Sequence, residues 1–225
     1  MSETGTTITE RVKRTLAALP ENVDLVAAAK TRSPNEVRAA LAGGIRFIAQ
    51  NYVQEAEAAV AAVGRTAAQW HMIGHLQRNK VKAAVVLFDM IQTVDSLRLA
   101  EKISAEAVKV ERTMPILIEI NSALEPQKSG VLPDDAIDLV RAVAELPALR
   151  IEGLMTMGPL TADPEDVRPL FRRTKKLFDQ LADLAIPNVA MKTLSMGMSS
   201  SYAVAIEEGS TMIRIGTALF GPRTS

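Results

Sequence analysis

The stretch Leu25-Val26-Ala27-Ala28-Ala29-Lys30-Thr31-Arg32-Ser33-Pro34-Asn35-Glu36 decides which fold this chain is expected to adopt. Its apolar half predicts a buried strand, and a helix start follows directly. Ser33 can cap that helix, Pro34 suits its first position, and Glu36 completes a capping box three residues after the cap. Lys30 is therefore expected where the strand ends, which in a (β/α) barrel is the rim that carries active-site side chains.

A lysine at such a rim has a chemical use. At the mouth of an apolar barrel it loses its proton more readily and can attack a carbonyl to form a Schiff base. An exposed surface lysine is the ordinary alternative. The apolar run directly before Lys30 argues against that alternative.

Short apolar runs and helical stretches alternate along the rest of the chain. Strands are predicted at about Val23 to Ala29 and at Ile45–Ala49, Gln69–Ile73, Met90–Val94, Ile116–Ile120, Ile151–Met155, Met191–Met196 and Met212–Ile215. Helices are predicted at Ile8–Leu19, Glu36–Ala42, Tyr52–Val63, Asn79–Leu87, Ser96–Val110, Asp134–Leu146, Pro164–Leu184 and Ser200–Glu208. Apolar strands that alternate with helices indicate a parallel sheet covered on its faces.

Eight such units in 225 residues predict one α/β domain, a (β/α)8 TIM-type barrel that spans residues 1–225. A doubly wound sheet is the alternative. The glycine pattern Gly-x-Gly-x-x-Gly, which such a sheet uses to bind dinucleotides, does not follow the first strand.

Composition excludes several classes of function. The 26 basic and 26 acidic side chains cancel, which argues against nucleic acid or an anionic membrane as the main partner. The absence of cysteine excludes disulfide and thiolate chemistry. The first ten residues lack the basic and apolar regions of a signal peptide, and no apolar stretch approaches the roughly 18 residues of a membrane span. We therefore expect a cytoplasmic protein.

Two loops near the C-terminus are rich in glycine and hydroxyl side chains. Ser195–Ser201 follows the seventh predicted strand, and Gly216–Gly221 follows the eighth. Small residues let backbone N–H groups approach an anion, and hydroxyls add donors. These loops form the usual phosphate site of a barrel, although glycine and serine are common in any turn. With an amine at Lys30, they indicate a phosphorylated aldehyde, and pyridoxal phosphate fits.

Six segments carry a family resemblance. They are Ala29-Lys30-Thr31, Asn51–Glu55, Trp70–Lys80, Lys128-Ser129-Gly130, Leu194–Ser199 and Gly209–Gly221. In this order they resemble the pyridoxal-phosphate-binding homeostasis proteins, whose fold is similar to the N-terminal barrel of alanine racemase. The Trp-His block and the Arg-Ile-Gly-Thr block are highly specific.

The resemblance implies that Lys30 carries pyridoxal 5'-phosphate (PLP) as a Schiff base and that Asn51 lies beside the ring. It implies that Arg214 faces the pyridine nitrogen, with a barrel-rim salt bridge as the alternative role for Arg214. A guanidinium stays protonated and donates to that nitrogen, which weakens the ring as an electron sink. The phosphate is implied to be surrounded by Ser195, Gly197, Ser199, Gly216 and Thr217.

The chain departs from the family at a few positions. Ala49-Gln50 stands where the family usually has Gly-Glu, so a charge near Lys30 is lost. Ser201 and Ala203 replace acidic residues after the phosphate loop. Because Ser199 or Ser200 can cap the following helix, we expect phosphate binding to persist with a changed affinity.

Three further side chains could suggest other sites. His71 and His75 are four residues apart, but they flank a strand end and a glycine and have no third ligand, so no metal site is expected. Lys128 lies in a loop after strand five, where a secondary contact with the cofactor is a hypothesis.

The sequence favours a carrier over an enzyme. Racemases of the similar fold take a second acid–base group from an additional β-domain and a partner subunit. After strand eight and its glycine-rich loop the chain has only Gly221–Ser225, so we expect no such domain and no two-base mechanism. The prediction is a monomeric, non-catalytic PLP-binding protein that buffers the cofactor in the cell and transfers it to apo PLP-dependent enzymes.

Two enzyme classes remain as alternatives. One is a PLP-dependent amino-acid racemase or a related fold-type III enzyme. The other is a Schiff-base aldolase that uses Lys30 on a sugar phosphate. The aldolase explains the lysine and the phosphate loops, but it does not explain the run of specific motifs.

Overall fold

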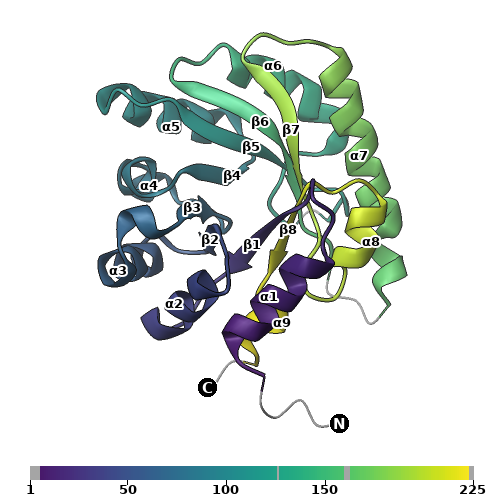
Figure 1. Cartoon of the computed structure of the whole chain (residues 1–225). Coiled ribbons are helices and arrows are strands. Elements are labelled where there is room, and N and C mark those ends of the chain that lie inside the picture. The colour runs from purple at the N-terminus through teal and green to yellow at the C-terminus, as the bar shows by residue number, and fades with distance from the viewer. Residues whose placement is uncertain (1–5, 126, 160–162, 223–225) are drawn as a thin grey trace.

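Eight parallel strands close into a barrel in chain order, with helices around the outside (Figure 1). The computed structural model describes residues 6–125, 127–159 and 163–222, so the first five residues of the stretch tested for a signal peptide and Arg223–Ser225 of the tail lie outside it. The strands are β1 Asp24–Ala28, β2 Phe47–Gln50, β3 Gln69–Met72, β4 Met90–Val94, β5 Met114–Ile120, β6 Leu149–Thr156, β7 Val189–Ser195 and β8 Met212–Ile215.

Helices follow the strands as the α/β prediction requires. The α-helices are α1 Ile8–Ala18, α2 Pro34–Ala42, α3 Val53–Val63, α4 Val81–Leu87, α5 Leu97–Lys109, α6 Ala136–Ala144, α7 Arg168–Asp183, α8 Tyr202–Glu207 and α9 Thr217–Phe220. Short 3-10 helices are η1 Arg65–Ala67, η2 Arg78–Lys80, η3 Pro133–Asp135 and η4 Pro164–Val167. None of the helices in the described ranges combines the length and apolar character that crossing a bilayer requires.

The barrel prediction is confirmed, and each predicted strand overlaps an observed one. The capping box after Lys30 is also present, because Ser33 Oγ accepts from the Glu36 N–H at 3.3 Å and the Ser33 N–H donates to the Glu36 carboxylate at 2.8 Å. The main differences lie at helix starts. Three predicted helices begin as the 3-10 turns η2, η3 and η4, in each of which the N–H of the third residue makes an i+3 bond, as Lys80 does to the Gln77 carbonyl oxygen at 2.9 Å.

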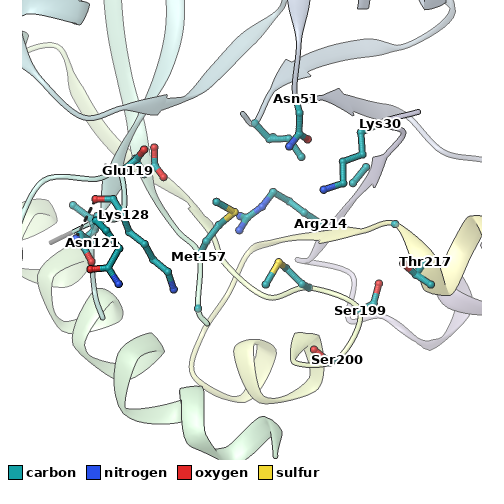
Figure 2. Close-up of a pocket in the computed structure, with 18 of the residues that line it drawn as sticks. Lys30, Asn51, Glu119, Asn121, Lys128, Met157, Ser199, Ser200, Arg214 and Thr217 are labelled. Carbon is teal, nitrogen blue, oxygen red and sulfur yellow. Dashed lines mark hydrogen bonds between the residues drawn. The ribbon is translucent and has the colours of Figure 1, made fainter. Parts of the chain in front are cut away.

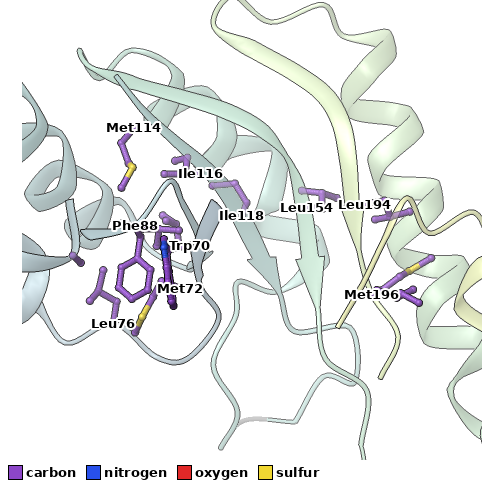
Figure 3. Close-up of a cluster of buried hydrophobic side chains, with 14 of the residues drawn as sticks. Trp70, Met72, Leu76, Phe88, Met114, Ile116, Ile118, Leu154, Leu194 and Met196 are labelled. Carbon is purple, nitrogen blue, oxygen red and sulfur yellow. The ribbon is translucent and has the colours of Figure 1, made fainter. Parts of the chain in front are cut away.

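Most of the hydrophobic core lies between the strands and the helices (Figure 3). Its largest side chains include Trp70 and Phe88, which are fully buried. Burying an apolar side chain of this size stabilises the fold by about 1.5–3 kcal/mol. The core thus fixes the strands against the helical layer around them.

A smaller set of apolar side chains fills the inside of the barrel. Val26, Ala49, Ile73 and Met212 form one cluster, against which Ala28 packs. Because successive strand residues point to opposite faces, Val26 and Ala28 on the inner face place Lys30 on that face as well. The apolar interior therefore ends at a rim where Lys30 is the next inward residue.

Candidate functional site

A cavity of ≈ 780 Å³ opens at the C-terminal ends of the strands. This volume lies within the range of roughly 300–1,000 Å³ that is typical of small-molecule sites. Figure 2 shows that Lys30, Ser199 and Thr217 lie on one side and that Glu119, Asn121 and Lys128 lie on the other. The cavity is lined by Ala28, Lys30, Arg32, Asn51, Ile73, Glu119, Ile120, Asn121, Gln127, Lys128, Ser129, Met157, Gly158, Met198, Ser199, Ser200, Arg214, Gly216 and Thr217.

Lys30 follows β1, and its side chain points into the cavity (Figure 2). Its amine makes no hydrogen bond or ion pair with any residue that the structure describes. The next residue, Thr31, has a left-handed backbone with φ 61°. Arg32 holds this turn in place, because it donates to the carbonyl oxygen of Gly221 at 2.5 Å and to the Glu36 carboxylate at 3.0 Å. The loop that carries the amine is thus tied to the end of the last helix.

Asn51 follows β2 and lines the same cavity. Its backbone lies so close to Gly74 that a Cβ on this glycine would come within 2.3 Å of the Asn51 carbonyl oxygen. Gln50, at the position where the family has an acidic residue, is buried and does not line the cavity. Its Oε1 has no hydrogen-bond partner among the described residues.

The two predicted phosphate loops meet at the cavity. Ser199, Gly216 and Thr217 line it, and Ser199 Oγ accepts from the Ala218 N–H at 3.4 Å, which links one loop to the other. In the described ranges, the backbone N–H groups of Ser199, Ser200, Gly216 and Thr217 donate to no protein acceptor. Unpaired N–H groups that converge on a cavity form an anion site.

Gly197 and Ser195 do not line this cavity. Gly197 forms the turn beneath the loop with φ 96°, and a Cβ there would lie 2.6 Å from the Ala205 side chain. Ser195 lies deeper, at the end of β7, where it is fully buried. The structure therefore brings together six of the eight predicted site residues and places these two under the loop.

The prediction that Ser199 or Ser200 caps the next helix is wrong. The helix α8 begins at Tyr202, and its N-cap residue Ser201 makes no side-chain capping bond. Ser201 Oγ instead accepts from the Met198 N–H at 3.2 Å, inside the loop. This leaves the hydroxyl groups of Ser199 and Ser200 near the cavity.

Arg214 forms part of the cavity floor and is 4% exposed. One of its guanidinium nitrogens donates to Ser195 Oγ at 2.5 Å and the other to the Thr156 carbonyl oxygen at 2.8 Å. Burial lowers the pKa of Arg214 to about 10, and the nearby Glu119 carboxylate opposes that shift. The guanidinium is therefore still charged at neutral pH.

Glu119 on β5 is a site residue that sequence reasoning missed. It lines the cavity, it is 4% exposed, and its Oε2 has no hydrogen-bond partner in the part of the chain that is described. Burial and, to a lesser degree, Asp95 raise its pKa to about 7, while Arg214 acts in the opposite direction. An acidic residue within the apolar run Leu117–Ile120 was the available signal.

Lys128 lines the cavity on the side opposite Lys30 (Figure 2). Its ammonium pairs with the Glu125 carboxylate at 2.6 Å. Asn121 holds the same loop through a bond from its side-chain amide to the Glu125 carbonyl oxygen at 2.8 Å. A contact between Lys128 and the cofactor stays a prediction.

The two histidines lie in different surroundings. His71 is buried inside the barrel, and burial lowers its pKa to about 4, so that it is neutral. His75 is exposed. Within the described ranges, no three His, Asp or Glu side chains gather in a way that could hold a metal ion.

The cavity fits the phosphorylated aldehyde that the sequence suggested. It presents an amine without a protein partner, four unpaired backbone N–H groups that suit a phosphate, and a charged donor on its floor that suits a ring nitrogen. Each of these statements concerns the described residues.

Comparisons with known proteins agree with this geometry. Residues 6–224 match the family described as alanine racemase, N-terminal domain. The pyridoxal phosphate homeostasis protein of Aquifex aeolicus is 41% identical over 199 residues, which are 88% of this chain and 86% of that protein. PipY of Synechococcus elongatus PCC7942 with PLP bound has a TM-score of 0.89 at 35% identity, over 96% of this chain and 100% of PipY. Alanine racemase of Clostridium difficile 630, at 15% identity and a TM-score of 0.81 over 97% of this chain and 56% of its own, shares the fold.

Proposed function

Because this chain belongs to the pyridoxal phosphate homeostasis proteins of the alanine racemase N-terminal domain family, we propose that it binds PLP through a Schiff base to Lys30 and acts as a carrier. One observation carries the proposal. Lys30 and the residues of the two glycine-rich loops whose N–H groups are unpaired in the described structure line one cavity. When bound, the cofactor would supply an aldehyde able to condense with the Lys30 amine, with loss of water.

Each side chain of the site has a proposed task. The N–H groups of Ser199, Gly216 and Thr217 bind the phosphate, which needs several donors because it carries close to two negative charges. Asn51 borders the ring, and Arg214 donates to the ring nitrogen. Gly197 contributes through the turn that it forms under the loop.

The carrier role is supported by the charge on Arg214. A pKa of about 10 keeps the guanidinium protonated at neutral pH, so one of its N–H groups can donate to the ring nitrogen, which disfavours a protonated pyridine. A ring without that proton is a weak electron sink. The name of the Aquifex aeolicus relative, a homeostasis protein, also supports buffering of PLP and its transfer to apo PLP-dependent enzymes.

The site of attachment can be tested with two lysine variants. The protein as purified is expected to be yellow, and borohydride should fix a pyridoxyl group on the peptide that contains Lys30. Lys30→Ala should lose both signals. Lys128→Ala is the matched control, since it removes another cavity amine and should keep both. An adduct on Lys128, or none on either lysine, would contradict the proposal.

The racemase alternative has its own test. The holoprotein is incubated with each common amino acid in heavy water, and the α-proton is followed by NMR. A carrier should leave the α-proton in place over many hours. Rapid stereospecific exchange at a catalytic rate would favour the enzyme and overturn the carrier role.

A further inference from the structure

A chain of hydrogen bonds runs from Arg214 through the inside of the barrel. Arg214 donates to Ser195 Oγ at 2.5 Å, and Ser195 Oγ donates to Gln92 Oε1 at 2.7 Å. Gln92 Nε2 lies 2.9 Å from Nδ1 of His71. All of these side chains are buried, with at most 4% exposure, so the bonds between them are shielded from bulk solvent.

The direction of every bond in this chain follows from its first member. A guanidinium has donors only, so Ser195 Oγ must accept from Arg214 and can give its one hydrogen to Gln92 Oε1. The side-chain amide of Gln92 then turns its NH₂ group toward His71, whose Nδ1 must accept. The proton of the imidazole therefore sits on Nε2.

The opposite orientation of the Gln92 amide satisfies fewer groups. Ser195 would then receive N–H donors from both Arg214 and Gln92, and its own hydrogen would have no acceptor among the described residues. A buried donor without an acceptor destabilises the folded state, because it has lost its hydrogen bond to water and gained none in the protein. The neutral state of His71 agrees with the first orientation, since Nδ1 can accept only when it carries no proton.

We propose that His71, Gln92 and Ser195 form a positioning relay that sets the orientation of the Arg214 guanidinium beneath the cavity. The inference rests on the proposed function in one respect, namely that Arg214 faces the ring of a bound PLP. The relay fixes one guanidinium nitrogen, and the Thr156 carbonyl oxygen fixes the other at 2.8 Å. Two fixed nitrogens define the plane of the group, and hence where its remaining N–H donors point.

The relay gives Ser195 a role different from the phosphate contact that the resemblance implied. A phosphate ligand would act on the anionic tail of the cofactor. A positioning residue would act on the ring, through Arg214. These two roles can be separated with pyridoxal, which has the ring and the aldehyde of PLP but no phosphate.

The first experiment reads the relay directly and needs no cofactor. Long-range ¹H–¹⁵N NMR reports which imidazole nitrogen carries the proton, and the chain has only two histidines. His75→Gln leaves His71 as the sole signal and alters an exposed residue. We expect a proton on Nε2 and none on Nδ1 at neutral pH. A proton on Nδ1, or a charged ring, would overturn the relay, whether or not the protein binds PLP.

The second experiment links the relay to the site. Ser195→Ala should weaken binding of PLP and of pyridoxal alike, by about tenfold, because it removes one buried hydrogen bond to the charged guanidinium. Gln92→Leu leaves that bond in place but removes the group that orients Ser195, so it should weaken binding of both compounds by a smaller factor. Both variants should also shift the His71 signals. Weaker binding of PLP alone in Ser195→Ala would identify a phosphate ligand and overturn the relay, as would unchanged binding of both compounds. If the unmodified protein binds neither compound, the proposed function fails, while the NMR result still decides the relay.

Discussion

Glu119 shows what a single buried carboxyl does to this site. It stands on the inner face of β5 with an unpartnered oxygen in the described structure, near Asp95 and Arg214. Its environment favours the protonated acid at mildly acidic pH and the carboxylate above neutral pH. The charge inside the cavity therefore depends on pH in the physiological range.

The pKa of Glu119 makes a prediction about stability. Its pKa rises from 4.5 to about 7 on folding, so between these values the folded state binds more protons than the unfolded state. This contribution to the free energy of unfolding is present below pH 4.5 and is lost as pH rises toward 7. The loss is of the order of 3 kcal/mol.

Glu119→Gln tests this prediction, because glutamine has no carboxyl group to titrate. The free energy of unfolding is measured with urea at pH 5 and at pH 8 for both proteins. The value for the variant minus the value for the unmodified protein should be larger at pH 8 than at pH 5. Taking the difference between the two proteins cancels the opposite contribution of His71, whose lowered pKa makes stability rise with pH between about 4 and 6.5. Equal differences at both pH values would contradict the assignment.

At the scale of elements, the loop between β7 and α8 determines the phosphate side of the cavity. The loop turns at Gly197 and leads into α8, which is held from outside by ion pairs of Arg168 with Glu207 and Glu208. These contacts fix the short helix against the start of α7. Ser199 and Ser200, which line the cavity, thus belong to a loop that is followed by an anchored helix.

Replacing Gly197 tests this turn. Gly197→Ala should lose about 1–3 kcal/mol of unfolding free energy from the left-handed backbone and a further similar amount from the overlap with Ala205. Gly64→Ala is the matched control, since Gly64 has φ 98° but nothing within 4 Å of the added Cβ. Chemical denaturation of both variants should show a larger loss at Gly197, and a smaller loss there would mean that the turn can shift.

Sequence reasoning found the elements more completely than the contacts between them. Periodicity located every strand, because inner and outer faces are both apolar and the runs are continuous. It missed α9, which has four residues and is too short to show a helical period. It could not predict the contact of Ser195 with Gln92 or that of Gln92 with His71. The first joins residues about 100 positions apart and the second about 20, and both depend on how the closed barrel aligns its strands.

At the scale of the whole molecule, the least extensive strand pairing of the barrel near the site is the one between β7 and β8. In the described ranges, β7 and β8 share one register pair, Ser195 with Met212. Ser210 supports this junction, because its buried hydroxyl lies 3.1 Å from the Leu194, 2.9 Å from the Met196 and 3.0 Å from the Met212 carbonyl oxygen. One hydroxyl therefore holds two strands together beneath the phosphate loops.

Ser210→Ala should reduce the free energy of unfolding by about 1–3 kcal/mol and also weaken retention of PLP. Ser104→Ala provides the comparison, because Ser104 is a buried hydroxyl far from the cavity that donates to the Pro147 carbonyl oxygen at 2.6 Å. It should lose similar stability and keep its affinity for PLP, measured by equilibrium dialysis. Equal affinities in the two variants would show that the junction does not control the site.

The amine of Lys30 and the anion loops come from opposite ends of the chain and meet across the β1–β8 pairing. During synthesis, Lys30 is therefore made early, and the loops that would bind the phosphate are made later. A cofactor bound at both points would bridge β1 and β8. The yellow colour expected of the holoprotein would then require a barrel in which these two strands have already paired.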